Sequence, residues 1–222
     1  YSITPKLQDL KNVKYIKDFG GPTRASAIAS LLAEGKLITW LTDDAILKPD
    51  ALDSAINQLY DMGDDYKNVV TSKYIEGAGH PVHEQDWYYR INGKPDARPP
   101  TYSPHLPDSW WIFNIAIMYR SFFEELGGLD CSYEHAAMAD TDLAIRAQQS
   151  GANVKMTGIV MYHCDHGQSD HKPIEIAQSH FDVPLIQTRY GDSEWRDKVQ
   201  IDIDINNWRN FPTVWDRRFG VK

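Results

Sequence analysis

The stretch GGPTRASAIASLLAEGKLITWLTDDAILKPDAL, residues 20–52, decides the fold class of this chain. After the break at Gly20-Gly21-Pro22, apolar residues recur at helical spacing and predict a helix over residues 23–33. The run Leu37–Leu41 that follows is almost entirely apolar, as a strand buried on both faces should be. Pro49 then suits the first turn of another helix. A helix, a buried strand and a second helix in this order predict an α/β fold.

The same alternation of strands and helices continues along the chain. Expected strands cover residues 13–16, 69–74, 112–119 and 154–161, and expected helices cover residues 121–126 and 141–150. The sheet should therefore be mixed but mainly parallel and flanked by helices, in a Rossmann-like arrangement. Residues 77–109 contain six prolines and no clear period, which predicts a long functional loop. Residues 1–170 should form one domain, and residues 171–222 should pack on it as a polar and aromatic extension.

Composition excludes several classes of function. The chain has 222 residues, of which 42% are apolar, so it can form a core. Acidic residues outnumber basic ones by 31 to 23, and this balance leaves no basic footprint for nucleic acid. No apolar run is long enough to span a bilayer, so we expect a cytoplasmic protein, with peripheral attachment to a membrane left open. Cys131 and Cys164 are too few for a disulfide framework and are expected to be reduced, although a single bridge stays open.

Asp43 and Asp44 are the first candidates for chemistry, because they directly follow the expected buried strand. In open α/β sheets, ligands bind beyond the carboxyl ends of the strands. Adjacent carboxylates at such an edge can hold Mg²⁺ or Mn²⁺ together with substrate phosphates. The ordinary alternative is a turn in which one Asp accepts a backbone hydrogen bond and the other is solvated.

Asp140 stands at the expected start of the helix over residues 141–150. An Asp at this position usually caps the helix. A carboxylate held at a helix N-terminus also stays ionised and can act as a general base. Because a carboxylate has two oxygens, these two roles do not exclude each other.

Three further groups are candidate ligands. His163 and His166 have the spacing of a metal-binding pair, although solvated histidines are the ordinary interpretation. Trp110 and Trp111 could stack on the face of a sugar, with core packing as the alternative. Arg24 lies in the first turn of the helix after the glycine break, where an arginine can bind phosphate.

The order of these motifs adds information that no single motif carries. The stretch of residues 20–52 is followed by NIAIMYRSFFEELGGLD (114–130), ADTDLAIRAQQSG (139–151) and MYHCDHG (161–167). In this order, over about residues 13–166, the chain resembles family 2 glycosyltransferases of the GT-A fold. The resemblance implies metal-dependent, inverting transfer of a sugar from a nucleoside-diphosphate sugar to an acceptor hydroxyl.

The resemblance also implies roles on the donor side and for the base. Asp44 matches the acid of the DxD-type motif that holds Mn²⁺ or Mg²⁺ on the donor diphosphate, and Asp43 matches its neighbour near the ribose or the metal. Arg24 matches a basic position that faces the nucleotide. Asp140 matches the catalytic base. Arg146 matches an arginine on the same helix that is structural or faces phosphate.

On the acceptor side, Gly128 and Asp130 match the GG-[FL]-D turn of the family. Trp110 and Trp111 complete the expected acceptor-binding residues. His163 matches a late histidine that reaches the metal or the diphosphate in some members. A UDP-sugar is the expected donor, and a sugar, glycan or lipid-linked molecule is the expected acceptor. The sequence is compatible with a homo-oligomer.

The chain departs from the family pattern at three places. The usual opening strand, helix and second strand are absent, Ala139-Asp140 replaces the common Glu-Asp pair, and Thr42 replaces the first acid of the DxD motif. Two alternatives therefore stay open. A nucleotidyltransferase on a similar fold would use Asp44 and a metal without a base at Asp140, and a non-catalytic carbohydrate-binding relative would bind sugar without donor turnover.

Overall fold

The computed structural model describes residues 11–41, 45–76, 111–113, 115–163, 176–190 and 201–211. These residues form a mixed α/β fold around a five-stranded sheet in the order β1-β4-β3-β5-β2. The strands are β1 (Leu37–Ile38), β2 (Ala45–Leu47), β3 (Asn68–Glu76), β4 (Ala116–Tyr119) and β5 (Asn153–His163). The α-helices are α2 (Pro22–Leu31), α3 (Ala51–Asp61), α5 (Arg120–Glu125), α6 (Ala136–Gln149) and α8 (Val183–Tyr190), accompanied by the π-helical turn η2 (Gln178–Asp182) and the 3₁₀ turn η3 (Asn207–Asn210).

Within the described strands, the expectation of a mainly parallel sheet is wrong. Strands β3 and β5 pair in parallel, whereas β1 with β4, β4 with β3, and β5 with β2 pair antiparallel. Two strands that follow each other in the chain can pair in parallel only if a crossover connection, usually a helix, joins them. The sequence between β3 and β4 has no helical pattern for such a crossover. Because β4 is antiparallel to both of its neighbours, β1, β3 and β5 all run in one direction.

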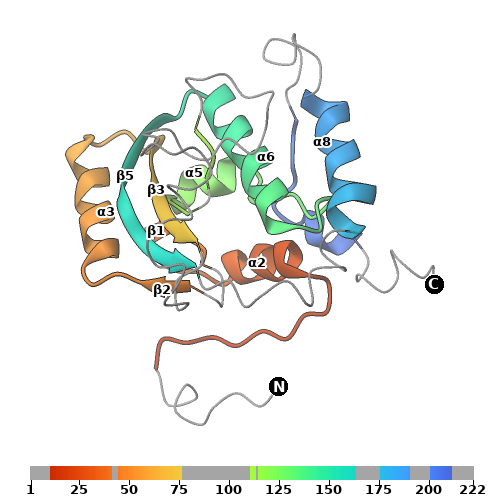
Figure 1. Cartoon of the computed structure of the whole chain (residues 1–222), viewed down its shortest axis with the longest axis horizontal. Helices are drawn as coiled ribbons and strands as arrows, with labels where there is room; N and C mark the ends of the chain where they lie inside the picture. Colours follow the sequence, from red (N-terminus) through yellow and green to blue (C-terminus); the bar gives the residue numbers. More distant parts are fainter. Residues whose placement is uncertain are drawn as a thin grey trace.

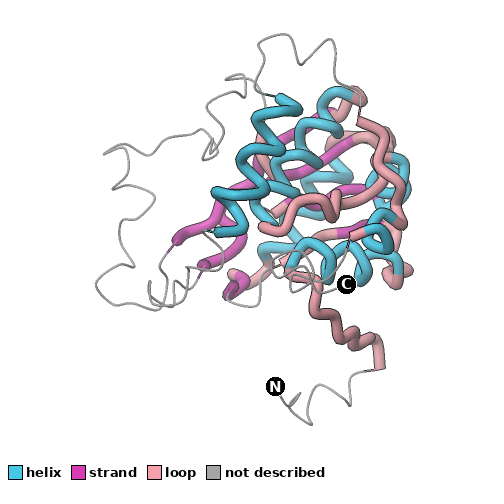
Figure 2. The backbone as a smooth tube through the Cα atoms, turned by 90° about the vertical axis from the view of Figure 1, so that its right-hand side faces the viewer, coloured by secondary structure: helices cyan, strands magenta, loops and turns pink. Residues whose placement is uncertain are grey.

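Helices cover both faces of the sheet (Figure 1). The amphipathic helix α3 packs on β3 and β5, with Ala55 and Leu59 fully buried against them. Helices α5 and α6 lie on the other face, and α8 packs against the outer side of α6 (Figures 1 and 2). The core between these layers includes Val69, Met118 and Leu143.

Several predicted elements differ in their bounds. Residues 13–16 form no strand but run as an extended segment, with Val13 and Tyr15 exposed. Pro49 lies in a turn before α3, whose N-cap is Asp50. The predicted strand Leu37–Leu41 pairs only at Leu37 and Ile38. None of the helices in the described ranges is both long and apolar enough to cross a membrane.

Helix α6 begins at Ala136, five residues before the predicted start. Alanine has the highest helix propensity, so the run from Ala136 to Ala139 extends the helix backwards. The N-cap is His135, whose Nδ1 accepts a hydrogen bond from the Ala137 backbone N–H. Asp140 therefore lies within the helix, and its predicted role as a cap is wrong.

Candidate functional site

One edge of the sheet collects the segments that carry the candidate residues. Because β1, β3 and β5 run in the same direction, their carboxyl ends share this edge, which we call the carboxyl edge. His163, at the end of β5, pairs with Glu76 of β3 on one side and with Ala45 of β2 on the other. Helix α6 runs back toward the start of β5, so its first turns lie toward the same edge, near α2 (Figure 1).

The two acids of the DxD-type motif, Asp43 and Asp44, lie outside the described residues. Their described neighbours are Leu41, which follows β1, and Ala45, which opens β2 opposite His163. Of these two, Ala45 is placed at the carboxyl edge by its pairing with the end of β5. Trp110 and His166 also lie outside the described residues.

Asp140 lies in the second turn of α6 and is 7% exposed. Burial raises the pKa of its carboxyl group well above the ordinary value, and the indole N–H of Trp40 lowers that pKa in part. The approach of these two groups falls short of hydrogen-bond geometry, because neither Asp140 Oδ1 nor Trp40 Nε1 has a bonding partner among the described residues. Trp40 stands three residues before Asp43, so Asp140 lies beside the strand end that leads into the acidic motif.

Asp142 has a different environment, although it is only two residues away. Its side chain is fully buried and accepts hydrogen bonds from Arg146 Nε at 2.7 Å, Tyr190 Oη at 2.7 Å and Arg189 Nη1 at 3.1 Å. Arg146 also donates to the carbonyl oxygens of Leu126 and Gly128. Asp142 and Arg146 therefore join α6 to α8 and to the turn after α5, which gives Arg146 a structural role.

The predicted phosphate ligand Arg24 already has a partner within the chain. Its Nη1 lies 3.2 Å from Asp18 Oδ1, and its guanidinium carbon lies 5.7 Å from the ring centroid of Trp208. Arg24 Nε is buried and has no hydrogen-bond partner in the part of the chain that the structure describes. The guanidinium thus keeps unused donor capacity.

The residues predicted to bind the acceptor make contacts within the protein. The Trp111 backbone N–H donates to Gln148 Oε1, and Gln148 Nε2 donates to the Trp111 carbonyl oxygen. Asp130 is 2% exposed, accepts from the Ser132 backbone N–H, and pairs with Arg189 at 2.6 Å. Burial raises the pKa of Asp130, but the bonds from Ser132 and the charge of Arg189 outweigh burial and hold this pKa below the ordinary value.

Gly128 has a positive φ of 69°, and a β-carbon there would lie 3.0 Å from Ile205. The segment of residues 201–207 thus packs on the Gly127-Gly128 turn, and Asn207 donates to the Leu129 carbonyl and accepts from the Cys131 N–H. These contacts support a structural role for Gly128, as those above do for Asp130. The acceptor-binding role of both residues stays a prediction.

Sequence reasoning missed the groups that surround the start of α6. Asp182, fully buried at the end of η2, accepts from the backbone N–H groups of Glu134 and His135 at 2.9 and 2.6 Å. Burial lowers the pKa of His135. No short-range pattern could reveal Asp182, because it lies 47 residues from His135; Trp40, which directly precedes the LTDD stretch, could have been found.

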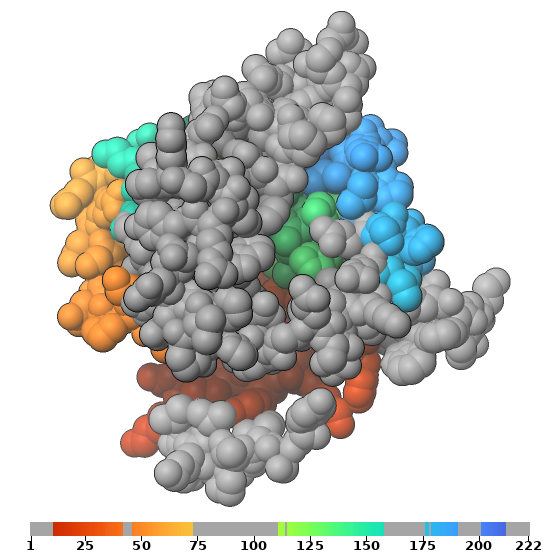
Figure 3. All heavy atoms as spheres, in the orientation of Figure 1, coloured from red at the N-terminus to blue at the C-terminus, as the bar shows by residue number. Residues whose placement is uncertain are grey.

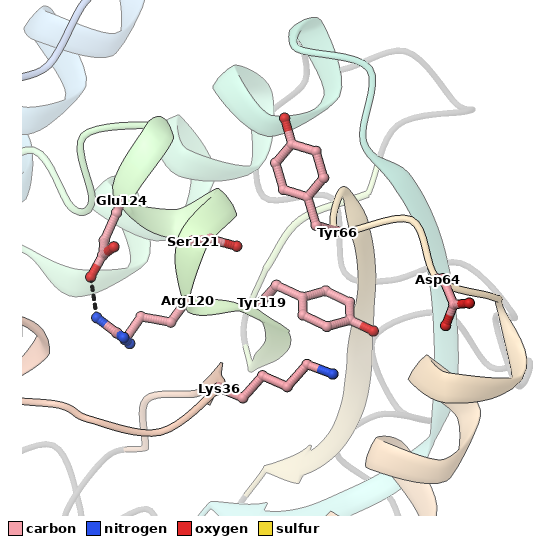
Figure 4. A pocket seen from close by; sticks show the side chains of 7 residues that line it. All are labelled: Lys36, Asp64, Tyr66, Tyr119, Arg120, Ser121 and Glu124. Atoms are coloured by element: carbon pink, nitrogen blue, oxygen red, sulfur yellow. Dashed lines mark hydrogen bonds and ion pairs between the residues drawn. The ribbon is translucent and has the colours of Figure 1, made fainter.

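A hollow lies at the end of the sheet opposite the carboxyl edge. It has a volume of about 440 Å³ and is lined by Lys36, Asp64, Tyr66, Tyr119, Arg120, Ser121 and Glu124 (Figure 4). The Lys36 ammonium lies 5.3 Å from the Tyr119 ring centroid, and Arg120 pairs with Glu124. None of the predicted site residues lines this hollow.

The structure describes only part of the residues that are predicted to bind a metal ion. Among the described side chains, no group of three or more His, Cys, Asp or Glu residues could hold a metal ion. For His163 the backbone is described, and Asp44 is absent from the described ranges. No protein-family model and no curated protein sequence matches this chain.

Proposed function

We propose that this chain is a metal-dependent glycosyltransferase that moves a sugar from a nucleoside-diphosphate sugar to an acceptor hydroxyl. The observation that carries the proposal is the position of Asp140 beside Trp40, close to the strand end that leads into Asp43 and Asp44. The resemblance in motif order to family 2 glycosyltransferases comes from the sequence, whereas the position of Asp140 beside Trp40 comes from the structure, so the two are independent of each other. Both support a donor site and a base at the same edge.

Asp140 has the properties of a general base once its proton has left. A carboxylate with a raised pKa is a stronger base than an ordinary one, and catalytic groups work best when their pKa approaches the operating pH. In the proposed reaction Asp140 accepts the proton of the acceptor hydroxyl. The acceptor oxygen bonds to the anomeric carbon from the face opposite the leaving group, and the bond from that carbon to the diphosphate oxygen breaks. The products are the inverted glycoside and a nucleoside diphosphate.

Asp44 and His163 would hold a divalent cation. The register supports this pairing, because Ala45, which follows Asp44 in the sequence, pairs with His163 across the sheet. Carboxylate oxygen and imidazole nitrogen are both ligands that Mn²⁺ accepts. A bound cation would neutralise the negative charge that develops on the departing diphosphate.

Calorimetric titration of the full chain with UDP tests the donor site. We expect UDP to bind more tightly with Mn²⁺ than without it, and this gain to be lost in Asp44→Ala. Asp61→Ala is the matched control, since it removes one carboxylate from the exposed end of α3. UDP binding that is equal with and without Mn²⁺, or equal in the Asp44→Ala variant, would contradict the metal-dependent donor site.

Transfer assays with a panel of UDP-sugars test the base. Asp140→Asn should keep UDP affinity and lower kcat by about 10²–10⁴-fold, the usual contribution of a general base. Full activity in this variant would exclude Asp140 as the base.

One observation favours a second candidate, a non-catalytic carbohydrate-binding relative. Asp140 is buried with a raised pKa, and Arg24 is paired internally with Asp18. A resting state with a neutral acid and an occupied arginine also suits a protein that no longer turns over a donor. Sugar binding without release of a nucleoside diphosphate from any UDP-sugar would favour this candidate.

A further inference from the structure

Asp18, Gly20 and Arg24 form a tight unit at the start of α2. Asp18 Oδ2 accepts from the Gly20 backbone N–H at 2.8 Å, and Asp18 Oδ1 lies 3.2 Å from Arg24 Nη1. A β-carbon on Gly20 would lie 2.3 Å from Arg24 Cδ and 2.7 Å from Asp18 Oδ2. Glycine at position 20 thus lets both side chains lie directly against the backbone.

Asp18 uses only part of the capacity of Arg24. A guanidinium has five N–H donors and binds carboxylate or phosphate best in a two-bond arrangement. The ion pair with Asp18 is made through Nη1, the buried Nε has no partner among the described residues, and the guanidinium carbon lies 5.7 Å from the Trp208 ring centroid. A ligand with several phosphate oxygens would satisfy Arg24 more fully than Asp18 does.

The segment that carries Asp18 is held to the molecule mainly by the pair between Asp18 and Arg24. Residues 11–20 run as an extended stretch along the outside of the molecule (Figures 2 and 3). Its large apolar side chains are 36–63% exposed (Val13, Tyr15, Ile16 and Phe19). Besides Asp18, Lys14 holds the segment through the Leu32 carbonyl and the exposed Glu34 carboxylate. Because the exposed pair of Lys14 contributes little and little apolar surface is buried, the cost of releasing the segment lies mainly in the Asp18–Arg24 pair, whose side chains are 10% and 17% exposed.

We propose that Asp18 is an autoinhibitory carboxylate that occupies Arg24 and competes with the diphosphate of the donor. The inference rests on the proposed function, because it takes Arg24 as a phosphate ligand. Binding of a diphosphate then requires that the Asp18 carboxylate leave Arg24. The apparent affinity is lowered by the fraction of molecules in which Arg24 is occupied.

Titration of the metal-free chain with inorganic pyrophosphate tests the competition. Asp18→Asn keeps an acceptor for the Gly20 N–H but removes the charge that faces Arg24. We expect Asp18→Asn to bind pyrophosphate about five- to tenfold more tightly than wild type, in line with the loss of one nearby like charge. In an Arg24→Gln background the same change should bring no gain.

Glu34→Gln is the matched control. It removes one carboxylate that binds the same segment, at the other end of α2 and away from Arg24. This variant should bind pyrophosphate with wild-type affinity. Equal affinities in wild type and Asp18→Asn, a gain that persists without Arg24, a gain of the same size in Glu34→Gln, or no pyrophosphate binding by any variant would each overturn the inference.

A parallel titration with UDP and Mn²⁺ separates this inference from the proposed function. If wild type binds UDP and Asp18→Asn binds it no better, the competition is wrong and the donor site stands. If Asp18→Asn gains pyrophosphate affinity through Arg24 and no variant binds UDP, the competition stands and the UDP-sugar donor is wrong.

Discussion

Asp140 is the residue in which the requirements of folding and of the proposed chemistry oppose each other. Its pKa is raised by burial, so the folded state resists ionisation that the unfolded chain undergoes near the ordinary Asp value of about 3.9. The associated stability is complete below that pH and is lost as pH rises through the folded-state pKa. Buried ionisable groups at functional sites commonly reduce stability in this way.

Asp140→Asn should therefore stabilise the protein at neutral and alkaline pH. Because each unit of pKa elevation corresponds to about 1.4 kcal/mol, we expect a gain that is largest at pH 8 and shrinks toward zero near pH 4. Urea denaturation of both proteins from pH 4 to pH 8 measures this difference. A stability difference that stays constant over this range would show that Asp140 titrates as an ordinary surface acid.

Trp40→Phe should move the pKa of Asp140 upward. The indole N–H is the group that lowers this pKa, whereas the ring packs on Phe123 at a centroid distance of 6.1 Å and a phenyl ring can keep that contact. If Asp140 is the base, the acid limb of the transferase pH–rate profile should shift to higher pH. A shift to lower pH would contradict the role of the N–H.

At the scale of elements, α6 is tied to its neighbours mainly through Asp142. Asp142→Ala leaves Arg146 as a buried charge without its carboxylate, which should cost about 3–5 kcal/mol. Arg189→Met should also cost about 3–5 kcal/mol, because Asp142 keeps Arg146 and Tyr190 as donors but the buried Asp130 loses its arginine. Arg120→Met, which removes the exposed pair with Glu124, should cost under about 1 kcal/mol. Chemical denaturation would contradict this ranking if all three variants lost the same stability.

Two glycines with similar backbone conformations allow the cost of backbone strain to be measured separately from the cost of a steric clash. Gly127 and Gly151 have φ values of 78° and 85°, but a β-carbon on Gly127 would lie 1.7 Å from the Ile203 carbonyl oxygen, whereas one on Gly151 would meet nothing within 4 Å. Gly151→Ala should cost about 1–2 kcal/mol of backbone strain. Gly127→Ala should cost more and should release the segment of residues 201–211 to limited proteolysis. Equal thermal shifts in the two variants would show that this segment does not pack on the glycine turn.

The sequence predicted elements well where the pattern is local. The helix after the glycine break and the strand over residues 69–74 appear as α2 and β3, because periodicity and breakers are short-range signals. The start of α6 was missed because Asp140 was taken as the N-cap, whereas the alanine-rich run before it continues the helix back to the N-cap His135. The direction of β4 depends on its pairing with β1 and β3, which no single stretch of sequence encodes. Asp140 was singled out by motif order, whereas Trp40 was missed although it directly precedes the LTDD stretch.

At the scale of the whole molecule, His135 joins three parts of the chain. It caps α6 through Nδ1, its backbone N–H donates to Asp182 in η2, and the carbonyl of the adjacent Glu134 accepts from Thr23 in α2. Burial lowers the pKa of His135 below the ordinary value of about 6.5. Protonation would also remove the lone pair that accepts the Ala137 N–H, so the folded state binds this proton less readily than the unfolded chain does.

The folded state should therefore lose stability as pH falls below about 6.5 and through the lower pKa of folded His135. His135→Asn keeps a strong N-cap acceptor and removes the titration. We expect the variant to match wild type at pH 7.5 within about 0.5 kcal/mol and to exceed it at pH 5, by about 1.4 kcal/mol for each unit by which the pKa is lowered. Asp140 changes stability in the opposite direction over part of this range, but it is present in both proteins, so the difference between them isolates His135. Urea denaturation at half-unit steps from pH 7.5 to pH 5 measures that difference, and parallel stability curves would show that His135 titrates alike in the folded and unfolded states.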